Sequence, residues 1–166
     1  ALYSGWERWR AAQAHGDKLR FPNLAYYAMH GFSHALMNEI ALDCGYPATA
    51  LKERLYAIVD DEGERFGLLI YTASTGTQGT LGGLVAVLPR LGAIAERALD
   101  RLALCSGDPI CAEHDPDAHT DERALSGAAC HSCLLVAETS CEARNLYLDR
   151  ALTAQTLSAG GTGLFE

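Results

Sequence analysis

The cysteines of this chain are concentrated in its second half. Five of the six lie between Cys105 and Cys141, and two of these five form a Cys-x2-Cys pair at Cys130 and Cys133. Four thiolates arranged as a tetrahedron are a preferred ligand set of Zn²⁺, and a Cys-x2-Cys turn supplies two of them. The spacing therefore predicts a structural zinc site. The other two ligands would come from Cys105, Cys111 and Cys141, which leaves one cysteine spare.

Other uses of the cysteines fit the sequence less well. Disulfide-built secreted domains are usually small, whereas this chain has 166 residues, of which 49% are apolar. A redox dithiol at Cys130 and Cys133 would normally open a helix after a strand, and no strand pattern precedes Cys130. Histidines could replace a thiolate, since His114, His119 and His131 lie in the same region, although His131 stands inside the Cys-x2-Cys turn.

Composition and charge limit the function classes. The length suits one hydrophobic core, and no apolar run approaches the roughly 18 residues of a membrane span, so we expect a soluble, cytoplasmic protein. The first residue is Ala1, and we expect the chain to be a piece of a longer protein.

The net charge of −8 argues against a general nucleic-acid-binding surface, which needs clustered basic residues. Residues 105–142 contain eight acids and one base, Arg123, so we expect nucleic-acid contact only through a larger complex. The eight acids are Asp108, Glu113, Asp115, Asp117, Asp121, Glu122, Glu138 and Glu142.

The periodicity predicts a fold of the α/β or α+β class, with a small β-sheet covered by helices and a zinc-stabilised C-terminal lobe. Residues 1–21 have no clean period and are expected to be a leader from a preceding region. Residues 22–104 should form the α/β core and 105–157 the cysteine-rich zinc lobe with a C-terminal helix. Residues 158–166 should form a tail.

A long core helix is predicted to start after Asn23 and to stop at Cys44-Gly45. Its histidines, His30 and His34, are four residues apart and therefore share a face. Gly31 stands where a metalloprotease would have glutamate, and helical histidines at this spacing usually pack or form hydrogen bonds. A second metal site at His30 and His34 is the alternative.

A β-hairpin is predicted next, with strands over 55–59 and 65–72 after a short helical turn over 49–54. The glycine-rich segment 73–83 is typical of a tight turn into a helix. A phosphate-binding loop is the alternative, although the segment has no P-loop lysine. Helices are predicted over 81–88 and from Pro89 to Leu102.

The last part of the chain combines a loop with a helix. Residues 111–130 have no sustained period and should form the loop. The segment Thr139-Ser-Cys-Glu142 has the spacing of a capping box, which predicts a helix from there to Ala154 with Cys141 in its first turn.

Six segments resemble the C-terminal zinc-binding domain of helicase-associated proteins, the MrfA type. The segments are His30-GFSHAL, Cys44-GYPATALKERLY, Leu69-IYTASTGTQGTLGGL, Cys105-SGDPICAEHDP, Gly127-AACHSCLL and Glu138-TSCEARNLYLDR. They cover about four-fifths of the chain. The similarity is greater to the DrmB branch of the family, from DISARM phage-defence systems, because the helicase branch has Cys-Pro-Ser-Cys where this chain has Cys130-His-Ser-Cys133.

The resemblance implies Zn²⁺ as cofactor and a set of ligands. The Cys-x2-Cys of the family falls on Cys130 and Cys133, and the Cys before its Asn-x-x-Leu-Asp run falls on Cys141. We expect Cys111 as the fourth ligand, because the turn at Asp108-Pro109 can aim its thiolate at the Cys130 loop. Cys105 is the reserve, since it follows a helical run and could point into the core.

The resemblance also implies a function. It indicates a non-catalytic zinc-binding accessory domain that holds a protein interface in antiviral defence or DNA processing. The partner would be a helicase subunit or a helicase domain of the same chain, because this chain has no Walker lysine or DEAD-type box. The alternative is a hydrolase that acts on nucleotides or phosphodiesters through His30, His34 and the glycine-rich segment.

Overall fold

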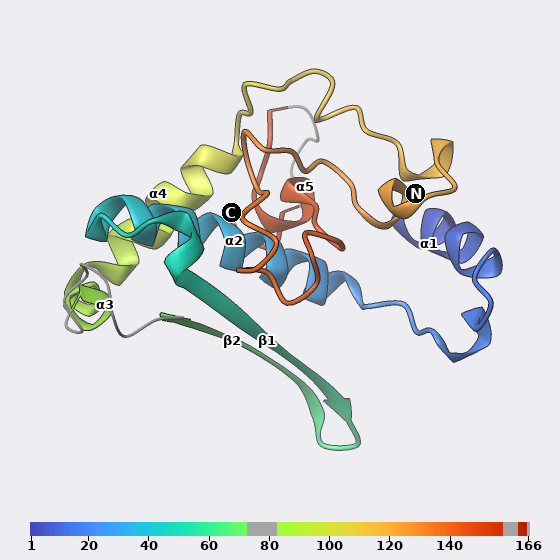
Figure 1. Cartoon of the computed structure of the whole chain (residues 1–166), viewed down its shortest axis with the longest axis horizontal. Coiled ribbons are helices and arrows are strands. Elements are labelled where there is room, and N and C mark those ends of the chain that lie inside the picture. The colour runs from blue at the N-terminus through green and yellow to red at the C-terminus, as the bar shows by residue number, and fades with distance from the viewer. Residues whose placement is uncertain (73–82, 158–162, 166) are drawn as a thin grey trace.

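The computed structural model describes residues 1–72, 83–157 and 163–165. Its helices and strands confirm the expected mixed fold (Figure 1). The elements are α1 (Leu2–Ala11), α2 (Leu24–Cys44), β1 (Leu51–Asp60), β2 (Gly63–Thr72), α3 (Gly83–Ala86), α4 (Leu91–Leu102) and α5 (Arg150–Thr153), with 3₁₀ turns at Gly16–Lys18, Ala48–Ala50, Leu88–Arg90, Pro116–Ala118 and Glu122–Leu125. Within these described ranges, no helix is long and apolar enough to cross a membrane.

The long helix α2 has the start and the stop that the sequence predicts. The Asn23 side chain accepts a hydrogen bond of 2.8 Å from the Tyr26 N–H, which caps the first turn. At the other end Gly45 adopts φ +67°, the left-handed conformation that glycine tolerates, and its N–H bonds to the Ala41 carbonyl.

Helix α2 runs through the middle of the molecule, between α4, α5 and the base of the hairpin (Figure 1). Most of its side chains are buried on several sides, as expected for a helix without a solvent face. One apolar core lies where α2 meets α4 and β1, and a second lies where α2 and α4 meet the C-terminal segment. Their buried residues are Leu36, Met37, Ile40, Ala41, Leu51, Val87 and Ile94 in the first and Ala35, Ala98, Leu102, Leu134, Leu148 and Ala154 in the second.

The predicted hairpin is confirmed, with β1 and β2 paired antiparallel from Leu51↔Thr72 to Asp60↔Gly63. The predicted helical turn over 49–54 was wrong from Leu51 onward. Leu51, Glu53 and Leu55 are buried in alternation with more exposed neighbours, because one face of β1 packs on the body of the molecule.

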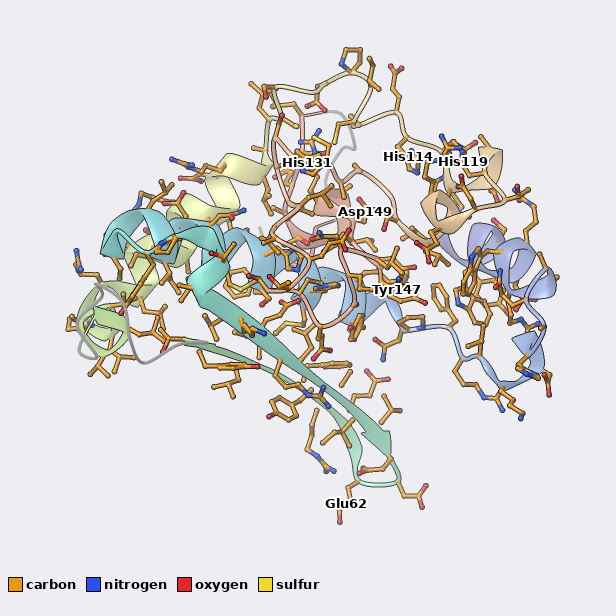
Figure 2. All side chains as sticks on the ribbon, viewed as in Figure 1. Glu62, His114, His119, His131, Tyr147 and Asp149 are labelled. Atoms are coloured by element: carbon orange, nitrogen blue, oxygen red, sulfur yellow. The ribbon has the colours of Figure 1, made fainter. Side chains whose placement is uncertain are left out.

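The other face of the ribbon is exposed, and the far half of the hairpin extends away from the helices, with Glu62 in its turn (Figure 2). We call this the hairpin outer face. It consists of Lys52, Arg54, Tyr56, Ile58, Arg65, Leu69 and Tyr71, which the strand register places on one side.

Residues 1–21 contain a helix that packs on the cysteine-rich region. Helix α1 contacts the turns at 116–118 and 122–125. Trp6 is buried, and Arg8 pairs with Asp117 at 2.7 Å. Gly5 allows this approach, since a Cβ there would lie 2.8 Å from the Ala124 carbonyl oxygen.

The helix predicted from the capping box to Ala154 was largely wrong. Only Arg150–Thr153 is helical, and Arg144, Asn145 and Tyr147 before it have φ of 54°, 60° and 61°. The N–H groups of Ala143 and Asn145 donate to Cys141 Sγ at 3.3 and 3.1 Å. The segment therefore satisfies its backbone through a thiol and forms a loop.

The predicted helices before Cys105 correspond to α3, the turn at 88–90 and α4, with Pro89 in the 3₁₀ turn between the helices. The glycine-rich segment lies outside the described residues over 73–82.

Candidate metal centre

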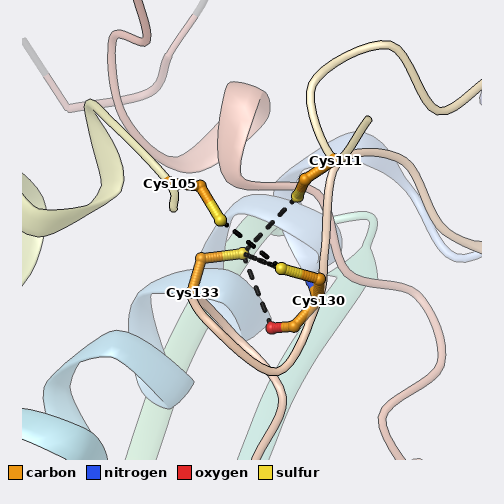
Figure 3. A group of neighbouring side chains, drawn as sticks. All are labelled: Cys105, Cys111, Cys130 and Cys133. Carbon is orange, nitrogen blue, oxygen red and sulfur yellow. Dashed lines mark hydrogen bonds between the residues drawn. The ribbon is translucent and has the colours of Figure 1, made fainter. Parts of the chain in front are cut away.

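Four cysteines from two segments converge beside the end of α4, and we call them the four-cysteine cluster (Figure 3). Cys105 and Cys111 come from the turn that follows α4, and Cys130 and Cys133 come from the later Cys-x2-Cys turn. Their four Sγ atoms lie within 4.8 Å of one another. Cys105 and Cys111 are buried, and the other two are partly exposed.

The sulfur separations fit one tetrahedral metal ion. The Sγ atoms of Cys105 and Cys130 are 3.4 Å apart, and Cys133 Sγ is 3.8 Å from those of Cys111 and Cys130. A Zn–S bond of about 2.3 Å in a tetrahedron gives sulfur separations of about 3.8 Å. Disulfide sulfurs lie about 2.05 Å apart, so these thiols are not bonded to one another.

Backbone N–H groups surround the sulfurs. The Gly107 N–H donates to Cys105 Sγ at 3.3 Å, and the Ser132 N–H donates to Cys130 Sγ at 3.4 Å. Such hydrogen bonds stabilise a thiolate. A Cβ at Gly107 would lie 3.2 Å from Cys130 Sγ, so glycine leaves the sulfurs enough room at this turn.

A buried arginine supports the Cys105 side of the cluster. The fully buried Arg150 donates to the Leu102 carbonyl at 2.8 Å and pairs with Asp108. The other oxygen of Asp108 accepts the Cys105 N–H at 3.1 Å. Together these bonds fix the turn between α4 and Cys111 relative to α5.

The charge of the cluster calls for a cation. Burial, with the neighbouring Cys130 thiol, raises the pKa of Cys111 to about 12, and burial also raises the pKa of Cys133. Burial acts in the same direction on Cys130, but the Ser132 N–H and the adjacent thiols lower its pKa overall. Four adjacent thiols therefore cannot all ionise at neutral pH by themselves. A divalent cation would offset two of the four negative charges of the thiolates, and four sulfur ligands would close its coordination sphere.

The structure brings together three of the four expected ligands. Cys111, Cys130 and Cys133 lie in the four-cysteine cluster, and the reserve residue Cys105 completes it. Cys141 lies elsewhere, with its Sγ 3.2 Å from His30 Nε2. The residues after α4 turn back at Asp108, which aims Cys105 at Cys130 instead of at the apolar core. The spacing along the sequence could not show whether Cys105 or Cys141 joins the other three cysteines.

The histidines near the cysteines lie outside the cluster. His131 is exposed, while His114 and His119 stack with ring centroids 4.9 Å apart (Figure 2). None of the three belongs to a group of metal-binding side chains within the part of the chain that the structure describes.

Comparisons with known proteins agree with this geometry. The family model described as MrfA Zn-binding domain matches residues 32–134, a stretch that contains the whole four-cysteine cluster. The DISARM protein DrmB of Bacillus paralicheniformis (strain ATCC 9945a / NCIMB 11709 / CD-2) is 35% identical over 169 residues, which cover 100% of this chain and 28% of the relative. The chain thus spans less than a third of that protein's length. With its four converging cysteines, the chain belongs to the MrfA Zn-binding domain family, and its cofactor is zinc.

Proposed function

We propose that this chain is a non-catalytic, zinc-binding accessory domain of a DISARM-type defence protein. The observation that carries the proposal is the four-cysteine cluster, with Cys105, Cys111, Cys130 and Cys133 as ligands. Four sulfur ligands leave no open position for water or substrate, which is the pattern of a structural site. In this proposal the metal holds the two cysteine turns together and stabilises the surface around them.

The defence context rests on the relative. DrmB is named as a DISARM protein, and its similarity extends over the whole of this chain. The parent protein would act in the cytoplasm with a helicase subunit or a helicase domain of its own chain. Any ATP hydrolysis would take place in that partner.

A hydrolase is the competing proposal, and the burial of its histidines counts against it. His30 and His34 are 0% exposed, so a nucleotide cannot reach them without a rearrangement of the core. We expect the chain to have neither nuclease nor ATPase activity. Turnover that persists through purification and disappears in His34→Ala would favour the hydrolase.

The hairpin outer face supports a role in protein interaction. Tyr56, Ile58, Leu69 and Tyr71 are all more than 40% exposed on one side of a ribbon that extends away from the helices. Exposed aromatic and aliphatic side chains gathered in a patch are typical of protein interfaces. The proposed occupant is the helicase partner.

Co-purification of the parent protein with its helicase partner tests this role. The double variant Tyr56→Ser and Leu69→Ser should weaken the complex at least about tenfold, which corresponds to about 1.4 kcal/mol. The matched control is Val85→Ser and Leu88→Ser, which removes apolar side chains that are even more exposed, from α3 and the turn after it. Equal retention of the partner by both variants would exclude the hairpin outer face as the interface.

Nucleic-acid contact is expected only through the larger complex. Several basic residues are already paired with acids, such as Arg65 with Asp60 at 2.5 Å and Arg54 with Glu142 at 3.5 Å. With a net charge of −8, the chain should bind duplex DNA weakly near physiological salt. Submicromolar binding that weakens steeply with added salt would contradict this expectation.

A further inference from the structure

A second group of potential metal ligands lies inside the core, and we call it the core cluster. His30 and His34 project from one face of α2, Glu53 from β1 and Cys141 from the loop before α5. Their ligand atoms lie within 4.8 Å of one another, and all four side chains are buried. His30 and Cys141 lie outside the stretch that the family model matches.

Both histidines are oriented by backbone carbonyls. His30 Nδ1 lies 3.2 Å from the Tyr147 carbonyl oxygen, and His34 Nδ1 lies 2.8 Å from that of Leu134. A carbonyl oxygen only accepts, so each Nδ1 carries the proton of its ring. In the neutral imidazole each Nε2 then has a lone pair. Metal-binding histidines are held by the same type of bond, from the other ring nitrogen to a carbonyl.

The lone pairs point at other acceptors. Glu53 Oε1 lies 3.0 Å from Nε2 of His30 and 3.0 Å from Nε2 of His34. Glu53 Oε2 is buried and has no hydrogen-bond partner among the described residues. A carboxylate that faces two nitrogen lone pairs in a dry core is repelled unless a positive charge lies between them.

Protons are a poorer source of this charge than a metal ion. Protonation of both Nε2 atoms would place two imidazolium rings side by side with centroids 4.5 Å apart. One divalent cation needs no added proton on either ring, and it balances a Glu53 carboxylate and a Cys141 thiolate.

Cys141 is held in the way that a thiolate ligand requires. Its Sγ accepts the N–H groups of Ala143 and Asn145, and it lies 3.2 Å from His30 Nε2. The positive φ angles of Arg144 and Asn145 curl the loop around the sulfur. The Glu53 N–H also donates to the Ser140 carbonyl at 3.1 Å, which places the carboxylate next to the cysteine.

We propose that His30, His34, Glu53 and Cys141 form a second Zn²⁺ site, separate from the four-cysteine cluster. Two imidazole nitrogens, one carboxylate and one thiolate are ligands that Zn²⁺ accepts in tetrahedral sites. The expected nitrogen–oxygen and nitrogen–sulfur separations in such a tetrahedron are about 3.3 to 3.6 Å. Glu53 Oε1 lies 3.0 Å from the Nε2 atom of each histidine, and Cys141 Sγ lies 3.2 Å from His30 Nε2, so these three pairs need to open by only a few tenths of an ångström. The site would cross-link α2, β1 and the loop before α5.

Metal counting on the 166-residue chain tests the proposal. The wild type should hold two zinc ions per chain by elemental mass spectrometry. His34→Gln and Cys141→Ala should each lose the zinc ion of the core cluster and keep one ion. Cys130→Ser should lose the zinc ion of the four-cysteine cluster. The matched control is His119→Gln, which changes a histidine outside both clusters and should keep two. Two ions in both His34→Gln and Cys141→Ala would overturn the proposal.

A measurement on the wild type keeps the test decisive if the core variants do not fold. The chain reconstituted with ¹¹³Cd should give two cadmium resonances, because cadmium reports the number of sulfur ligands through its chemical shift. One should fall in the region of four sulfurs, and the other in the region of mixed nitrogen, oxygen and sulfur ligands. A single four-sulfur resonance with one equivalent of bound metal would refute the second site.

Discussion

The two clusters differ in how the chain builds them. The four-cysteine cluster joins two short turns near the surface, and each turn contributes two sulfurs that are close in sequence. The core cluster joins a helix, a strand and a loop, and its Glu53 and Cys141 are far apart in the chain. A metal held by two local turns can stabilise a loop-rich lobe. A metal held by a helix, a strand and a loop, as in the core cluster, would instead attach the loop before α5 to α2 and β1.

The comparison predicts different consequences for the loss of each cluster. Without its metal the four-cysteine cluster leaves a lobe with little regular structure, since only 3₁₀ turns and α5 are described beyond α4. The core cluster is surrounded by α2, the hairpin and α5, so apolar packing should retain part of the fold there.

The largest effect is expected from Cys130→Ser and Cys105→Ser. Each removes a sulfur from the four-cysteine cluster, and structural zinc contributes about 10 to 16 kcal/mol in small peptides. A whole domain has only about 5 to 15 kcal/mol of net stability, so the lobe should unfold. Zinc content and circular dichroism measure this loss. Cys44→Ser is the control, because Cys44 lies at the end of α2 outside both clusters.

The same variants decide between Cys105 and Cys141 as the fourth sulfur ligand. In the cadmium-substituted chain, the four-sulfur resonance should vanish in Cys105→Ser and remain in Cys141→Ser. If it instead survives Cys105→Ser and vanishes in Cys141→Ser, then the ligand set expected from the sequence is correct and the one proposed from the geometry is not.

The sequence predicted features with a local signature. The cap at Asn23, the stop at Gly45 and the turn of the hairpin depend on residues close in the chain, and the structure confirms them. The Cys-x2-Cys pair has the same local character. Its two thiols do lie together in the structure.

Features that depend on side-chain hydrogen bonds to the backbone or on tertiary packing were missed. Helical spacing after Thr139 suggested a helix, but Asn145 bonds to the backbone of Val136 through its side chain and to Cys141 through its N–H. The position of Glu53 beside the two histidines depends on how the hairpin packs on α2, which spacing along the chain does not encode. A His-x3-His pair on a buried helix was the only available signal.

Gly31→Ala should have the next largest effect, and it tests the packing next to the core cluster. A Cβ at Gly31 would overlap Oγ1 of Thr153, a side chain that is fully buried. We expect a loss of about 3 kcal/mol in the free energy of unfolding, because overpacked cores cannot relax completely. Denaturant titration measures it. Gly92→Ala in α4 is the control, since nothing lies within 4 Å of its new Cβ, and it should be neutral or slightly stabilising.

If Gly31→Ala leaves two zinc ions bound, then the metal sites tolerate a shift of α5. Loss of the core zinc alone would show that the core cluster depends on the α2–α5 contact while the four-cysteine cluster does not. An unfolding free energy equal to that of the wild type would contradict the close approach of Thr153 to Gly31.

Asn145→Ala should have a smaller effect, concentrated on the core cluster. The Asn145 side chain donates a hydrogen bond of 2.8 Å to the Val136 carbonyl. It also accepts a hydrogen bond of 3.1 Å from the Val136 N–H. We expect a loss of about 2 kcal/mol, at about 1 kcal/mol for each hydrogen bond. Asn145→Gly loses the same hydrogen bonds, but glycine adopts the φ of 60° with less strain than alanine. The difference in stability between the two variants therefore measures the backbone strain. Thermal unfolding that is unchanged in both variants would show that the loop around Cys141 is held in another way.

The smallest effect is expected from Asp117→Asn, away from the ligands of both clusters. A hydrogen bond from Ser4 and the Arg8 guanidinium lower the pKa of Asp117 below its ordinary value. Because the folded-state pKa is depressed, the contact stabilises the fold above the ordinary pKa of aspartate, and this stabilisation is lost as the pH falls through the depressed value.

At pH 7 the variant should have a slightly lower Tm than the wild type, and the difference should shrink below about pH 3.8 and with added salt. Asp61→Asn in the hairpin turn is the control, because it removes the same charge at a site away from α1. If Asp117→Asn has the same Tm as the wild type at every pH from 7 to 3, then α1 is attached to the lobe without a contribution from the Asp117 carboxylate, through contacts such as the burial of Trp6 and the close approach at Gly5.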